Sequence, residues 1–66
     1  MSDFKTRLLD EKAQLDERIA KLVDFQISEN FQKINATQQT LLNIQVKAMD
    51  TYSQVLLERI VLLNAE

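Results

Sequence analysis

The chain has 66 residues, contains no cysteine, histidine, glycine or proline, and carries a formal net charge of −2 at pH 7. A chain of this length forms at most one small domain, whose core is marginal unless a disulfide, a metal ion or a partner adds stability. The missing cysteine and histidine exclude disulfides, thiolate zinc sites and the commonest general base, so we expect no metal, no cofactor and stabilisation by self-association.

Charge and hydropathy exclude further classes of protein. A weakly acidic chain has no overall attraction for nucleic acid or for an anionic membrane, so we expect neither as a partner. No apolar run approaches the roughly 18 residues needed to span a bilayer, and residues 1–5 lack the apolar core of a signal peptide, which predicts a cytoplasmic protein. Because turns in sheets depend on glycine and proline, their absence favours an all-α fold.

The first predicted element is a helix over about residues 3–26. Ser2 or Asp3 is a suitable N-cap, and leucines recur every seven residues at Leu8, Leu15 and Leu22. The other faces carry alternating charges, which we interpret as a solvated surface.

The predicted connector covers residues 27–35 and contains a short helical turn. Ser28 is placed to cap this turn, and Phe31 and Ile34 are apolar residues that would close the end of a two-helix hairpin. Asn35 is followed three residues later by Gln38, which resembles a capping box and predicts a second helix over about residues 36–63.

The second helix carries two adjacent apolar heptad rows. One antiparallel neighbour covers only one stripe of a helix, so we expect the first helix on one side and another subunit on the other. Residues 1–66 are thus predicted to form a single antiparallel hairpin that assembles into a helical-bundle homo-oligomer, with one long bent helix as the alternative. The predicted oligomer-interface residues are Leu41, Leu42, Ala48, Met49, Val55, Leu56, Leu62 and Leu63.

A polar row lies beside these apolar rows. Gln45, Tyr52 and Arg59 are seven residues apart, and Arg18 lies on the corresponding edge of the first helix. A tyrosine ring stacks on a base and an arginine binds a phosphate with two hydrogen bonds, so these four are candidate ligand-binding residues. The alternative is structural: an interface tyrosine, an Arg59 ion pair across helices and a glutamine that fixes register. Adjacent carboxylates on a helix diverge, and we expect no catalytic residues and no enzyme activity.

Two stretches resemble a known family. Residues 7–25 follow the pattern Arg-Leu-x-x-Glu-Lys-x-x-Leu-x-x-Arg-Ile-x-Lys-Leu-x-x-Phe, and Phe-Gln-Lys-Ile follows in the connector. Residues 38–60 follow Gln-Gln-x-Leu-Leu-x-x-Gln-x-x-Ala-Met-x-x-Tyr-x-x-x-Leu-x-x-Arg-Ile. This pattern resembles a family of small tailed-phage helical proteins named after a protein of a crAss-like phage. The resemblance implies a phage accessory protein that acts in the host bacterial cytoplasm.

Small phage hairpins without enzyme chemistry often act by binding. We therefore expect a counter-defence protein that sequesters a nucleotide-type immune signal, such as a cyclic nucleotide or an ADP-ribose derivative, between subunits. Two alternatives stay open at this point: a module that binds and inhibits a host protein by helix-in-groove contact, and a structural small phage protein.

Overall fold

Helices make up almost the whole of the described chain. The computed structural model describes residues 3–65, and its elements are α1 (Asp3–Gln26), α2 (Glu29–Lys33) and α3 (Ala36–Ala65). No strand occurs between residues 3 and 65, so the predicted all-α class is confirmed. None of these three helices has an apolar stretch long enough to cross a bilayer.

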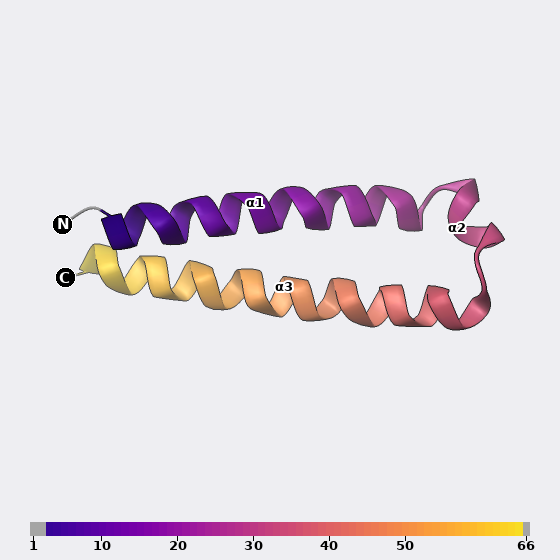
Figure 1. The fold of residues 1–66 in the computed structure, drawn as a ribbon. Helices are drawn as coiled ribbons and strands as arrows, with labels where there is room; N and C mark the ends of the chain where they lie inside the picture. The colour runs from indigo at the N-terminus through magenta and orange to yellow at the C-terminus, as the bar shows by residue number, and fades with distance from the viewer. Residues whose placement is uncertain (1–2, 66) are drawn as a thin grey trace.

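The two long helices lie side by side and run in opposite directions (Figure 1). The short helix α2 joins them at one end, and the start of α1 lies beside the end of α3 at the other. The molecule measures 48 × 15 × 13 Å. A 30-residue helix is about 45 Å long, so the length of the molecule is essentially that of α3.

The core is a thin seam between α1 and α3. Leu8 and Leu15 of α1 pack against Leu56 and Ile60 of α3, and Leu56 has no exposed surface. Partly buried side chains extend the seam on both sides; they are Ile19, Met49 and Leu63. Each fully buried leucine contributes about 1.5–3 kcal/mol relative to an exposed one, so this cluster is the main apolar contribution within one chain.

The core differs from the sequence prediction in which rows of α3 it uses. Leu56, Met49 and Leu63 were expected at an interface between subunits, but their side chains pack against α1. The remaining contacts with α1 come from a row that the sequence analysis did not select, namely Val46, Ser53 and Ile60. Ser53 interrupts this row with a polar side chain, which is why hydropathy alone did not identify it.

A second apolar row of α3 is left uncovered within one chain. The side chains of Leu41, Val55 and Leu62 are 53%, 50% and 66% exposed. Together with Ala48 they are spaced seven residues apart, so they share one side of the helix, next to the seam. We call Leu41, Ala48, Val55 and Leu62 the outer row.

The connector is held by specific contacts. Phe31 is buried and its ring meets that of Phe25 edge to face, with centroids 6.0 Å apart. Asn35 Oδ1 accepts a hydrogen bond of 2.7 Å from the backbone N–H of Thr37, which confirms the predicted N-cap of α3. The predicted Ser28 side-chain cap is wrong, because Ser28 Oγ donates instead to the carbonyl oxygen of Phe25 at 2.6 Å.

A polar cluster lies along one edge of the seam. Ser53 Oγ donates to Asp16 Oδ1 at 2.5 Å, and Lys12 Nζ donates to Asp16 Oδ2 at 2.7 Å and to Ser53 Oγ at 3.0 Å. The hydrogen bonds from Lys12 and then from Ser53 hold the pKa of the Asp16 carboxyl below its usual range, against a small opposing effect of desolvation. Because the cluster connects α1 to α3 at one height, it fixes their register.

Candidate functional site

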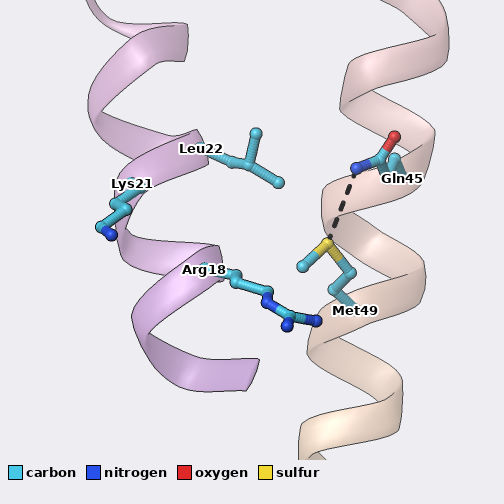
Figure 2. Close-up of a pocket in the computed structure, with 5 residues that line it drawn as sticks. All are labelled: Arg18, Lys21, Leu22, Gln45 and Met49. Atoms are coloured by element: carbon cyan, nitrogen blue, oxygen red, sulfur yellow. Dashed lines mark hydrogen bonds between the residues drawn. The ribbon is translucent and has the colours of Figure 1, made fainter. Parts of the chain in front are cut away.

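The opposite edge of the seam contains an open pocket between α1 and α3 (Figure 2). Its volume is about 330 Å³, within the range of roughly 300–1,000 Å³ typical of small-molecule sites. Arg18 is two residues from Asp16, and such residues point about 200° apart on a helix, which places the pocket and the polar cluster on opposite edges. The pocket is lined by Arg18, Lys21 and Leu22 of α1 and by Gln45 and Met49 of α3.

Arg18 is the cation that faces this pocket. Figure 2 shows its guanidinium extending from α1 toward α3, beside Met49, whereas Lys21 points away from α3. Lys21 Nζ lies 3.3 Å from Glu17 Oε1, and both of these side chains are largely exposed. Within residues 3–65, neither salt bridge involves Arg18. Arg18 therefore has its donors available for an anion, and the aliphatic stem of Lys21 contributes to the wall.

The floor of the pocket is apolar with one amide. Leu22 points across the gap toward α3, and Met49 lies opposite it. Gln45 Nε2 donates a long hydrogen bond of 3.9 Å to Met49 Sδ, one turn further along α3. A thioether is a weak acceptor, so the Gln45 amide readily exchanges this contact for a stronger one. The combination offers an anion site, an amide and an apolar surface within one pocket.

The structure places two of the four candidate ligand-binding residues in the pocket and the other two outside it. Arg18 and Gln45 line the same pocket. Arg59 lies near the start of α1, with its guanidinium carbon 5.8 Å from the centroid of the Phe4 ring. Fourteen residues separate Gln45 from Arg59, which is about 21 Å along a helix. Tyr52 lies midway between them and is 44% exposed, outside the lining of the pocket.

Sequence reasoning did not assign Lys21, Leu22 or Met49 to a ligand site. Two of them carried a usable signal, because Lys21 is three residues after Arg18 and Met49 is four after Gln45, spacings that place side chains on one helix face. Within residues 3–65 no group of three or more histidine, cysteine, aspartate or glutamate side chains is placed to hold a metal ion.

These features define a small all-α protein with a cationic and apolar pocket between its two long helices, a class of protein suited to binding. The family model described as Sequestin matches residues 2–62, and the chain belongs to the Sequestin family. That name indicates a protein that sequesters another molecule, which is a binding role. No curated protein and no solved structure matches the chain.

Proposed function

We propose that the protein is a non-catalytic phage accessory protein that sequesters a nucleotide-type immune signal within a helical oligomer in the cytoplasm of the host bacterium. The observation that carries the proposal is the pocket at Arg18, Gln45 and Met49, taken together with the sequestering role that the family name indicates. The phage setting rests on the resemblance of residues 7–25 and 38–60 described above.

The chemistry of the pocket matches the parts of a nucleotide. The Arg18 guanidinium supplies parallel donors for phosphate oxygens, and Leu22 with Met49 supplies an apolar surface for a base. The Gln45 amide both donates and accepts, as the edge of a base or a ribose hydroxyl requires. A pocket of about 330 Å³ accommodates one nucleotide unit and leaves the remainder of a larger signal exposed.

Lys21 is available as a second cation. Its ion pair with Glu17 is exposed and joins residues four apart on one helix, and such pairs contribute only about 0.3–0.5 kcal/mol. A hydrogen bond to a charged group contributes about 1.5–3 kcal/mol, so a phosphate group near Arg18 competes successfully for Lys21. Lys21 would have to turn from its position in the structure, where it points away from α3, to bring a second positive charge to the pocket.

Calorimetric titration tests this proposal. Cyclic dinucleotides and cyclic ADP-ribose isomers are titrated into the wild type, Arg18→Ala and Lys47→Ala, the last being an exposed cation of α3 outside the pocket. We expect one of these compounds to bind the wild type, Arg18→Ala to weaken binding roughly ten- to a hundredfold, and Lys47→Ala to have little effect. If none of these compounds binds the wild type, the nucleotide role is wrong.

The uncovered outer row favours a second candidate function. Leu41, Val55 and Leu62 form an apolar stripe on a helix, the surface that an amphipathic helix presents to a groove in a partner. A host protein bound and inhibited through this stripe would be retained by the wild type in a pulldown and lost with Val55→Glu. Arg18→Ala would leave that retention unchanged, which distinguishes this function from signal sequestration.

A further inference from the structure

The outer row is symmetric about a point beside Tyr52, midway between residues 51 and 52. Leu41 and Leu62 lie eleven and ten residues on either side of Tyr52, and Ala48 and Val55 lie four and three residues away. A helix that packs antiparallel on a second copy of itself pairs residues at equal distances from the twofold axis. With the axis beside Tyr52, between residues 51 and 52, Leu41 meets the Leu62 position of the other copy and the small Ala48 meets the larger Val55 position.

The extent of this face suits a second copy. The outer row extends from Leu41 to Leu62, about 32 Å along α3, so a second copy of α3 can pack against it over about six helical turns. The row has leucines near both ends and no charged member, and each of its three large side chains is half exposed or more. One chain alone has only a thin core between two helices, so covering this row is a substantial gain in apolar burial.

The same symmetry acts on the polar residues. Gln45 and Arg59 each lie seven residues from Tyr52, on opposite sides. An antiparallel contact centred beside Tyr52 therefore places Arg59 of the second copy beside Gln45 of the first. Within one chain these two residues are about 21 Å apart along α3, too far for one nucleotide unit to bridge.

We propose that two copies of the chain pack antiparallel through α3, with the twofold axis beside Tyr52, and that each copy contributes Arg59 to the pocket of the other. The complete site is then Arg18, Gln45 and Met49 from one copy and Arg59 from its partner. The dimer has two such sites, one on each side of the Tyr52 pair. This inference rests on the proposed nucleotide role and assigns the site its second phosphate-binding arginine.

Arg59 is available to bind a phosphate in the pocket of the second copy. Its contact with the Phe4 ring is at the surface, where Phe4 is 54% exposed, and an exposed cation–π contact is weaker than a charge-assisted hydrogen bond to phosphate. The pocket is open on one side, so a ligand bound at Arg18 can extend out of it toward Arg59 of the second copy.

A mixing experiment tests the shared site. Arg18→Ala and Arg59→Ala each disrupt both sites of a homodimer, so each variant alone should bind cyclic di-AMP or cyclic ADP-ribose at least tenfold more weakly than the wild type. In a mixed dimer the two substitutions fall in one site and leave the other intact. Random mixing at equal amounts should therefore restore wild-type affinity at about a quarter of the sites.

The controls separate the possible failures. A mixture of Arg18→Ala with Lys47→Ala keeps half of its sites intact whether or not subunits exchange, so it gives the signal expected from a known fraction of intact sites. Unfolding and refolding the mixed variants together ensures that subunits exchange. If the wild type binds neither compound, the nucleotide role and this inference both fail. If the wild type binds but mixing Arg18→Ala with Arg59→Ala restores no tight sites, the shared site is wrong and the nucleotide role survives.

A crosslink tests the axis without any ligand. The chain has no cysteine, so Tyr52→Cys introduces a single thiol beside the proposed axis. Mild oxidation should convert most of this variant to a disulfide-linked dimer, because residues beside the axis of an antiparallel contact approach within the few ångströms that a disulfide requires. Asp50→Cys, an exposed position on another side of α3, should stay largely monomeric on a denaturing gel. Equal crosslinking of the two variants, or none at Tyr52→Cys, overturns the proposed axis.

Discussion

Leu56 and Leu57 are adjacent leucines whose replacement by alanine should have very different costs. Leu56 has no exposed surface and packs within the cluster of Leu8, Leu15 and Ile60, whereas Leu57 is 40% exposed. Truncating a fully buried leucine to alanine costs about 2–5 kcal/mol, because it removes apolar burial and leaves a cavity. Leu57 is already 40% exposed, so its truncation removes less apolar burial and we expect a loss on the order of 1 kcal/mol or less.

The expected loss of stability for Leu56→Ala is large relative to the total stability of the chain. At about 0.05–0.15 kcal/mol per residue, a chain of 66 residues has roughly 3–10 kcal/mol of stability, so Leu56→Ala removes about a fifth of it or more. Because a loss of 1 kcal/mol lowers the melting temperature of a domain this small by about 4–8 °C, we expect a decrease of about 8 °C or more for Leu56→Ala. Leu57→Ala should melt within a few degrees of the wild type.

Circular dichroism at 222 nm during heating measures both variants at several protein concentrations. The comparison uses one residue type at neighbouring positions, so helix propensity is the same in both. Equal losses for the two variants, or a larger loss for Leu57→Ala, would refute the packing of α3 on α1 described here. A melting temperature that rises with protein concentration would show in addition that unfolding is linked to dissociation.

Three further predictions concern the ends and edges of the seam. Asn35→Ala should lower the free energy of unfolding by about 0.5–2 kcal/mol in urea titration, because it removes the N-cap hydrogen bond to Thr37, and Asn35→Ser should restore most of it. The pKa of the Asp16 carboxyl is lower in the folded state than in the unfolded state, so its ionised form stabilises the fold above the unfolded pKa of about 4. This stabilisation is lost as the pH falls through the folded pKa. Ser53→Ala removes one of the hydrogen bonds that lower this pKa, so it should flatten that part of a profile of stability against pH. Phe31→Ala should cost about 3–5 kcal/mol in the same urea titration, since its buried ring closes the end of the core against Phe25, whereas Ile27→Ala, at an 81% exposed position, should cost far less.

The helical class and the N-cap of α3 could be predicted because they depend on local chemistry. The absence of glycine and proline leaves little that ends a helix, and Asn35 caps a helix through its own side chain and the next two residues. The buried position of Phe31 was predicted from an aromatic residue in a polar connector for a similar reason. These local signals can be interpreted without knowing which residues of another helix pack nearby.

The rows of α3 could not be assigned correctly from hydropathy alone. The outer row is more uniformly apolar than the row of Val46, Ser53 and Ile60, yet the latter packs against α1. Ser53 is buried because Lys12 and Asp16 of α1 satisfy its hydroxyl, and this depends on the register between two helices. Hydrophobic patterning identifies both rows as apolar surface but does not say which one meets α1.

The candidate site was partly predictable, because residue spacing along a helix shows which side chains share one face. A spacing of seven placed Gln45, Tyr52 and Arg59 on one edge of α3, and Arg18 lines one pocket together with Gln45. Spacing within a helix gives no information about distance along the partner helix, so it could not show that Arg59 lies beside Phe4, far from Arg18. A second copy of the chain is what would bring these arginines together.

Native mass spectrometry of the full chain, purified from bacteria that produce a cyclic nucleotide immune signal, tests the central claim most directly. It reports subunit number and any retained small molecule in one spectrum. We expect an even-numbered oligomer of the 7.7 kDa chain that carries additional mass equal to a nucleotide signal, with that mass lost in Arg18→Ala. A wild-type spectrum that shows the protein without any retained nucleotide, from cells in which the signal is present in excess, would contradict the account.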